Sequence, residues 1–197
     1  SIDPDTGYKV SHFIGDARTC DPENPVETAA CMKKLREFHG LSLKTDHEFD
    51  LFGHIDFYES LWDGRSSAYE DYRQTKAHVW ALRPFIEGQA GERALTHIDA
   101  VPDNFLLFEN GKGEEEIRLI DWEYAAMQDP HVDIAMFCIY SLYDREQVDR
   151  LIGQYFTEGC PEGTRIKIYC YIAVCGLLWS NWCEYKRSLG VEFGEYS

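Results

Sequence analysis

The sequence predicts an α+β fold that is mainly helical, and three observations lead to this prediction. Apolar residues recur at helical spacing over most of the chain, with helix start and stop residues between the segments. Residues 105–120 instead contain two short apolar runs separated by the turn residues 110–113, which is typical of a β-hairpin. A further strand pair is expected within residues 1–14, where residues 3–7 suit a turn and residues 8–14 alternate between polar and apolar.

The composition indicates one globular unit with a strongly acidic surface. The 197 residues, of which 44% are hydrophobic, are enough to bury a substantial core. The formal charge of -16 argues against nucleic acid or an anionic membrane as partner, because both require a basic surface. A cationic small molecule remains compatible with this charge.

The cysteines and the apolar stretches indicate a cytoplasmic protein. The seven cysteines are scattered without a C-x-x-C pair or a zinc spacing, as expected for free thiols in a reducing compartment. The most apolar stretch, residues 168–179, is shorter than the roughly 20 residues that cross a bilayer. We therefore expect a buried helix here and no membrane insertion.

The first helix is expected to begin after Asn24. Asn24 is a favourable N-cap, Pro25 suits the first helical turn, and Glu27 is placed to complete a capping box. Gly40 supplies a stop signal, and the neighbouring His39 is expected to be solvated.

The later helices follow the same signals. Asp144 and Gln147 form a second potential capping box, residues 88–91 interrupt the helical pattern, and His47 is expected to be solvated. The further helices are expected at residues 49–62, 68–86, 129–142, 144–159 and 163–188.

Three oxygen-bearing side chains are expected to converge at the open end of the hairpin. Asp99 and Asn104 precede its first strand, and Asp121 follows its second strand. A hairpin sets these two ends side by side. The spacing from His97 through Asp99 to Asn104, H-x-D-x-x-x-x-N, is that of a kinase catalytic loop.

This trio suits phosphoryl transfer. Asn104 and Asp121 offer the hard oxygen ligands that Mg²⁺ prefers, and Asp99 can orient an accepting hydroxyl and take its proton. The alternative is a surface hairpin with ordinary capping Asp and Asn residues, which the complete pattern makes the weaker interpretation.

The same residues carry a family resemblance. The segment HIDAVPDN, followed by LIDWEY and then by Asp129 and Asp133 in the pattern D-P-x-x-D, resembles the C-terminal lobe of choline/ethanolamine kinases. These kinases are relatives of the aminoglycoside phosphotransferases and share the protein-kinase-like fold. The resemblance extends loosely over residues 7–182. It implies that residues 1–19 are the end of an N-terminal lobe and a hinge, and that residues 20–197 form the helical C-terminal lobe.

The resemblance also implies structural and nucleotide-binding roles. Asp129 and Asp133 would cap a helix and accept hydrogen bonds from the catalytic loop, with metal ligation as the weaker alternative. His97 would be a structural hydrogen-bonding residue. Ile14 and Gly15 would belong to the hinge that meets the adenine of ATP, with a plain linker as an equal alternative.

Kinases of this family carry an N-terminal lobe with a phosphate-covering loop and a lysine, and neither is recognised in this sequence. The missing N-terminal lobe is therefore an expected partner, and the chain alone is expected to be inactive.

The last helix carries two tryptophans that suit a cationic substrate. Trp179 and Trp182 are three residues apart, so they share a helix face. A quaternary ammonium is held by aromatic faces. By resemblance, the cage would consist of these indoles and Tyr124, with Glu123 supplying negative charge. Tyr140 and Tyr143 are weaker candidates, and the alternative is that both indoles are core residues.

The expected function is ATP- and Mg²⁺-dependent phosphoryl transfer to the hydroxyl of choline, which gives phosphocholine. Two alternatives remain open at this stage. The chain could belong to a kinase for ethanolamine, an aminoglycoside or another small alcohol, or it could be a non-catalytic choline-binding lobe.

Overall fold

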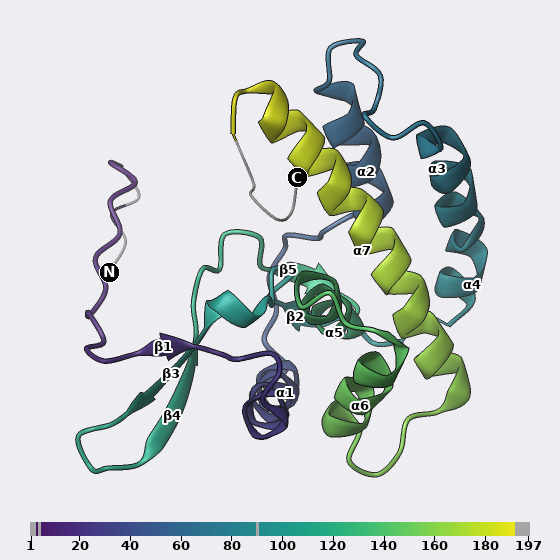
Figure 1. Cartoon of the computed structure of the whole chain (residues 1–197). Helices are drawn as coiled ribbons and strands as arrows, with labels where there is room; N and C mark the ends of the chain where they lie inside the picture. The colour runs from purple at the N-terminus through teal and green to yellow at the C-terminus, as the bar shows by residue number, and fades with distance from the viewer. Residues whose placement is uncertain (1–2, 4, 90, 192–197) are drawn as a thin grey trace.

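The computed structural model describes residues 3, 5–89 and 91–191, and it shows a helical body with a β-hairpin at one side (Figure 1). The mainly helical α+β prediction is confirmed. The helices are α1 (Pro25–His39), α2 (Leu51–Ser60), α3 (Tyr72–Ala81), α4 (Arg83–Gly88), the 3-10 turn η1 (Pro102–Asn104), α5 (His131–Tyr140), α6 (Arg145–Tyr155) and α7 (Glu162–Ser188). The strands are β1 (Arg18–Thr19), β2 (Ala94–Thr96), β3 (Phe105–Glu109), β4 (Glu115–Leu119) and β5 (Ala126–Gln128).

The strands form two nested antiparallel pairs around the predicted hairpin. β3 and β4 pair from Phe105 opposite Leu119 to Glu109 opposite Glu115, and β1 pairs with the outer side of β3. β2 and β5 lie outside this hairpin in sequence and pair with each other. The segment between β2 and β5 is therefore held by two strand pairs, the β2–β5 pair at its ends and the β3–β4 hairpin within it.

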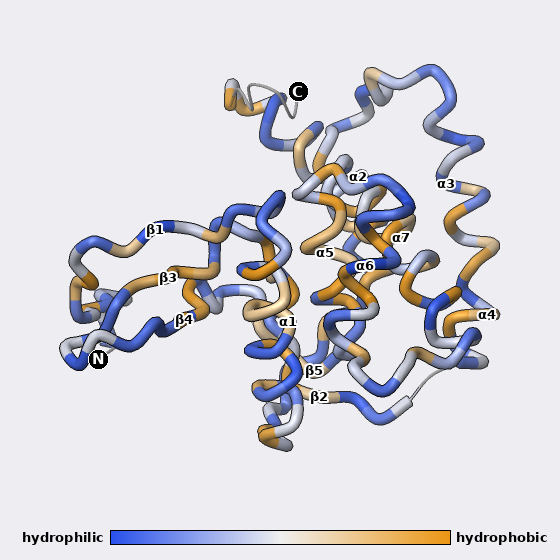
Figure 2. Tube along the Cα trace, turned by 60° about the horizontal axis from the view of Figure 1, so that its bottom comes forward, coloured by the Kyte–Doolittle hydropathy of each residue, from blue (hydrophilic) through white to orange (hydrophobic). Residues whose placement is uncertain are grey.

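Helix α7 is the element around which the helical body is built. It packs against α5 on one side and α2 on the other, while α1 packs against α6 (Figure 1). Figure 2 shows apolar segments gathered where these helices meet and hydrophilic segments in the outer loops. Two cores result. The first core includes Ile55, Val132, Val174 and Leu178, and the second core includes Leu35, Phe105, Phe137 and Ile152.

The apolar part of α7 is longer than the sequence suggested. By length and composition alone the whole helix could cross a membrane, but 50% of its most apolar window is buried inside the protein. Contacts with α2 and α5 account for that burial, which is the behaviour of a core helix. All seven cysteines are free thiols, as expected, and five of them are buried.

The two capping signals are confirmed, with one difference at the start of α1. The Asp144 and Gln147 side chains form the predicted capping box of α6. Asn24 caps α1 through Val26 N–H, but the Glu27 carboxylate pairs with Arg18 and accepts from Asp21 N–H instead of closing a box. The tertiary partner Arg18 competes successfully for this carboxylate.

The expected helix at residues 68–86 is divided. Its first residues form a loop because the Ala68 N–H donates to the Glu184 carboxylate on α7. The chain then breaks at Leu82, between α3 and α4. Pro84 explains this break, since proline has no N–H for the helical ladder and its ring crowds the preceding turn.

The turn of the predicted N-terminal strand pair is confirmed, while residues 1 and 2, which would belong to its first strand, lie outside the described residues. Gly7 N–H donates to the Asp3 carbonyl at 2.9 Å with Gly7 at φ +74°, which makes the turn. Residues 8–14 contribute no strand to either sheet of the described chain, and Phe13 is 95% exposed. The Asp3 N–H donates to the Tyr8 carbonyl at 2.9 Å, so the two sides of the turn are hydrogen-bonded to each other.

Candidate active site

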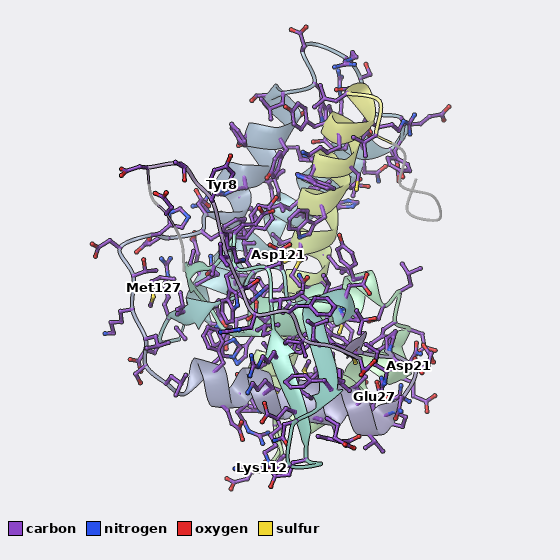
Figure 3. All side chains as sticks on the ribbon, turned by 90° about the vertical axis from the view of Figure 1, so that its left-hand side faces the viewer. Tyr8, Asp21, Glu27, Lys112, Asp121 and Met127 are labelled. Atoms are coloured by element: carbon purple, nitrogen blue, oxygen red, sulfur yellow. The ribbon has the colours of Figure 1, made fainter. Side chains whose placement is uncertain are left out.

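The hairpin brings Asp99, Asn104 and Asp121 together, as predicted. Asn104 ends η1 and leads into β3, and its carbonyl accepts the Ile120 N–H at 3.0 Å, so Asp121 lies directly beyond this closing bond. The Asn104 Nδ2 donates to the Asp99 carbonyl at 2.8 Å and to Asp99 Oδ2 at 3.0 Å. Figure 3 shows Asp121 near the middle of the molecule, far from the hairpin tip at Lys112.

Asp99 lies in an environment that suits a proton acceptor. Burial raises the pKa of the Asp99 carboxyl and outweighs His97 and Asn104, which lower it, while the charges of Asp121 and Glu123 add smaller increases. A carboxylate whose pKa is raised accepts a proton more readily.

The atoms available for a metal are few. Because Asn104 Nδ2 makes both hydrogen bonds to Asp99, its Oδ1 is the atom that can ligate a cation, together with the exposed Asp121 carboxylate. The described residues contain no cluster of three His, Cys, Asp or Glu side chains that would enclose a metal. One carboxylate and one amide oxygen fit Mg²⁺, which is usually bound by one or two carboxylates plus substrate phosphates and water.

The backbone before Asp99 is strained and anchored. Ile98 has φ +71°, a left-handed conformation that costs a β-branched residue about 1–3 kcal/mol. The buried Asp133 carboxylate accepts the His97 N–H at 2.9 Å and the Ile98 N–H at 2.8 Å. Hydrogen bonds to a charged group contribute about 1.5–3 kcal/mol each, enough to offset this strain. The predicted loop-anchoring role of Asp133 is confirmed.

Of the roles predicted for His97 and Asp129, the structure bears out the first and only part of the second. His97 Nε2 lies 2.8 Å from the Ile120 carbonyl, and since a carbonyl only accepts, Nε2 carries the proton. His97 is thus structural, as predicted, and it connects the loop to the residue before Asp121. Asp129 accepts from His131 N–H and from Lys167 Nζ, but it makes no bond to the loop in the described structure.

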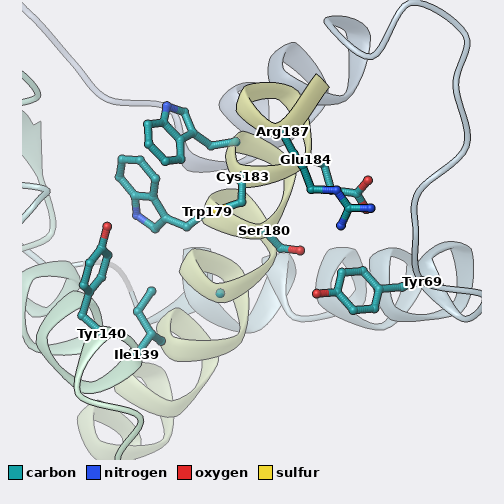
Figure 4. Close-up of a pocket in the computed structure, with 10 residues that line it drawn as sticks. Tyr69, Ile139, Tyr140, Trp179, Ser180, Cys183, Glu184 and Arg187 are labelled. Atoms are coloured by element: carbon teal, nitrogen blue, oxygen red, sulfur yellow. The ribbon is translucent and has the colours of Figure 1, made fainter. Parts of the chain in front are cut away.

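The aromatic residues line up beside this cluster. The Tyr124 and Trp179 rings meet edge to face with centroids 5.4 Å apart, and Trp179 and Trp182 meet similarly at 5.5 Å. Tyr140 lines a cavity of about 270 Å³ together with both indoles. Figure 4 shows Tyr140 of α5 and Trp179 of α7 close together, with Tyr69 and Arg187 across α7 from them.

Tyr143 is not part of this group, which corrects the prediction. Its hydroxyl donates to the Pro22 carbonyl, and its ring packs against Phe137 in the second core. The reason is local: α5 ends at Tyr140, and Leu142 has φ +52°, so Tyr143 no longer follows the helix face.

Sequence reasoning missed Tyr58 and Trp122. Tyr58 on α2 is 8% exposed and shares a hydrogen bond with the Tyr124 hydroxyl. Trp122 packs edge to face on His97 and on Phe38. Tyr58 lies in no recognisable motif, whereas Trp122 lies in the segment LIDWEY that carries Asp121 and could have been noted on that ground.

A second hollow lies on the other side of Asp121. A groove of about 1020 Å³ separates the N-terminal segment from the hairpin, and it is lined by Ile14, Ile120, Asp121 and Trp122 among others. Gly15 follows Ile14 directly but is not among its lining residues.

The fold and the site together define a phosphotransferase of the protein-kinase-like class. The profile of the phosphotransferase enzyme family (APH) matches residues 16–169, and the chain belongs to this family. Among curated proteins it is similar to Protein LicA of Haemophilus influenzae, with 26% identity over 211 residues that span 100% of this chain and 75% of that protein.

Solved structures agree with this assignment. Choline kinase LicA from Streptococcus pneumoniae superimposes with a TM-score of 0.82 and 29% identity, covering 100% of this chain and 68% of that one. A structure of LicA in complex with AMP gives a TM-score of 0.81, with 29% identity over 100% of this chain and 67% of that one. A choline/ethanolamine kinase family protein from Mesorhizobium loti gives 0.83, with 25% identity over 97% of this chain and 65% of that one. The resemblance seen in the sequence is confirmed.

Proposed function

We propose that this chain forms the substrate and catalytic-loop part of an ATP-dependent kinase that phosphorylates the hydroxyl of choline, giving phosphocholine. One observation carries the proposal: the Asp99, Asn104 and Asp121 cluster lies beside the aromatic group of Tyr124, Trp179 and Trp182. Asp99 accepts from Asn104, while Tyr124 connects the same segment to the indoles of α7. The names of the similar proteins, a choline kinase and a choline/ethanolamine kinase family protein, support the same substrate class.

Asp99 performs the central step in this proposal. Its carboxylate orients the alcohol and accepts the hydroxyl proton as the oxygen bonds to phosphorus. Asn104 and Asp121 hold Mg²⁺ through Oδ1 and the carboxylate. The metal, when bound, neutralises charge on the transferred phosphoryl group. The strained but anchored backbone at Ile98 keeps Asp99 in place for this step.

The aromatic group holds the cationic end of the alcohol. The rings of this group contact one another in the order Tyr124, Trp179, Trp182. Each cation–π contact with such a ring contributes about 0.5–2 kcal/mol. Lys186 Nζ lies 5.4 Å from the Trp182 ring centroid, so a cation already lies over this ring. Glu123 adds negative charge, and Tyr140 lines the adjoining cavity.

The nucleotide occupies the groove between the N-terminal segment and the hairpin in this proposal. Ile14 lines that groove next to Asp121, and Gly15 follows it in the hinge. This position places the phosphates of ATP near the proposed metal ligands. A LicA structure holds AMP, which supports a nucleotide in proteins of this kind.

Asp99→Asn tests the proposed reaction in the protein that carries this chain. The amide cannot take the proton, so kcat with choline and ATP should fall about 100–10,000-fold. Choline binding, measured by calorimetry, should persist because the aromatic group is intact.

The matched control is Asp103→Asn, the same chemical change at an exposed position of the same loop. It should retain near-normal turnover. Near-normal turnover in Asp99→Asn would refute the assignment of Asp99. A wild-type protein that binds choline but phosphorylates no alcohol would favour the non-catalytic binding lobe.

A further inference from the structure

A chain of buried polar side chains runs beneath the catalytic loop. The Tyr155 hydroxyl lies 2.8 Å from His39 Nδ1, and His39 Nε2 lies 2.9 Å from Asp133 Oδ2. The same Asp133 carboxylate holds the His97 and Ile98 amides. Asp133 is 0% exposed, Tyr155 6% and His39 9%. The sequence-based expectation of a solvated His39 is therefore wrong, because α1 ends against α5 and α6.

The proton positions in this chain follow from the partners. The His97 and Ile98 backbone N–H groups can only donate, so both Asp133 oxygens act as acceptors, and the matching tautomer of His39 carries its proton on Nε2. Burial raises the pKa of the Tyr155 hydroxyl, and the Asp133 charge raises it further, so this hydroxyl keeps its proton and can donate to His39 Nδ1. The hydrogen-bond donors and acceptors from Tyr155 through His39 to Asp133 are thus matched.

The geometry couples His39 to the residue before Asp99. Asp133 Oδ1 binds Ile98 N–H, and Oδ2 binds both His97 N–H and His39. A carboxylate that lost its bond to His39 could rotate and release the strained Ile98, and Asp99 would move with it. Arg36 reinforces the base of this arrangement by donating to the Tyr155 carbonyl at 2.7 Å.

We propose that His39, held by Tyr155, is a positioning residue that fixes Asp133 and thereby the direction of Asp99. This inference rests on the proposed function for its effect on turnover. A purely structural role at the junction of α1, α5 and α6 could be filled by apolar packing, which avoids the cost of burying polar groups. These buried polar side chains instead end on the His97 and Ile98 amides, so they can fix the backbone that precedes Asp99.

Kinetics of three variants test the proposal in the protein that carries this chain. His39→Phe keeps a ring but removes the donor to Asp133, and it should lower kcat about 10–100-fold with KM for choline within about threefold. His39→Gln places an N–H donor where Nε2 was, and it should recover most of the loss. Tyr155→Phe should give an intermediate kcat, because His39 remains but is less constrained.

Leu35→Ala is the matched control for lost stability. Leu35 is fully buried on the same helix and in the second core, and it has no polar contact to transmit. It should lower the unfolding midpoint yet leave kcat of the folded protein within about twofold. The proposal is overturned if His39→Phe behaves like Leu35→Ala, or if His39→Gln is as slow as His39→Phe.

Amide hydrogen exchange gives a readout that does not depend on catalysis. In His39→Phe, the His97 and Ile98 amides should exchange at least about tenfold faster, while Leu107 in the β3–β4 ladder should be unchanged. Unchanged exchange at His97 and Ile98 would overturn the anchoring role. A wild-type protein that transfers no phosphoryl group would refute the proposed function, and the exchange measurement would still decide whether His39 anchors the loop.

Discussion

Asp129 and Lys167 form a buried ion pair with 2.6 Å between Oδ2 and Nζ, and both side chains are less than a tenth exposed. Lys167 also donates to the Gln89 carbonyl, so the pair joins α7 to the segments that follow α4 and β5. Burial alone would raise the pKa of the Asp129 carboxyl. Bonds with His131 and Lys167 outweigh burial and hold this pKa well below its usual value of 3.8.

This depressed pKa makes stability depend on pH. The ionised Asp129 stabilises the fold fully above the unfolded-state pKa near 3.8, and the contribution is lost progressively as the pH falls below that value. Asp129→Asn should lower the free energy of unfolding by about 3–5 kcal/mol at pH 7, because it leaves the Lys167 charge buried and unpaired. Urea unfolding at pH 7, 5 and 3 measures the difference in free energy of unfolding between wild type and Asp129→Asn, which should become smaller only at pH 3.

The double variant Asp129→Asn with Lys167→Met serves as the control. It should recover part of the lost stability at pH 7, since no buried charge is left without a partner. A difference between wild type and Asp129→Asn that stays constant from pH 7 to pH 3 would contradict this account of the pair.

At the scale of single residues, the sequence located side chains that belong to a motif and missed those that act across the fold. Asp99, Asn104 and Asp121 follow from spacing plus a hairpin. His39 and Tyr58 lie on α1 and α2, and their partners are more than 60 positions away in the chain. Such contacts depend on how the helices pack, which the sequence does not show. His39, beside the helix stop at Gly40, was therefore predicted to be solvated.

At the scale of elements, α6 illustrates how local chemistry sets a helix start. Asp144 accepts the Gln147 N–H at 2.9 Å, and the Gln147 side chain accepts the Asp144 N–H at 2.9 Å. Asp144→Ala should lower the free energy of unfolding by about 1 kcal/mol, measured by urea denaturation. Asp50→Ala is the control, because Asp50 is the N-cap of α2 without a side-chain cap bond. Equal losses in both variants would contradict the role of the box.

The same scale shows why some elements were predictable. The β3–β4 hairpin and α7 carry their signals in their own residues, namely turn glycines and a long apolar pattern. The break at Leu82 was also readable, since Pro84 marks it. The loop at residues 68–71 was not, because it depends on the Glu184 carboxylate of α7.

At the scale of the whole molecule, the choice of alcohol depends on how α7 faces the hairpin. Trp182→Ala should weaken choline binding about tenfold, or about 1.4 kcal/mol, and should matter less for ethanolamine, which can donate hydrogen bonds. Calorimetric titrations with both alcohols measure this. Trp182→Phe keeps a ring and should retain most of the affinity, and an equal loss for both alcohols would argue against a cation–π role.

The nested strand pairs have a consequence for how such a protein can diversify. Every side chain assigned to the proton and the metal lies in the uninterrupted segment between β2 and β5, which is fastened at its base and again at its hairpin. The indoles come from α7, on a remote part of the chain. Substitutions on α7 can therefore change which alcohol is bound, while the residues that carry out phosphoryl transfer are inherited together on one unchanged segment.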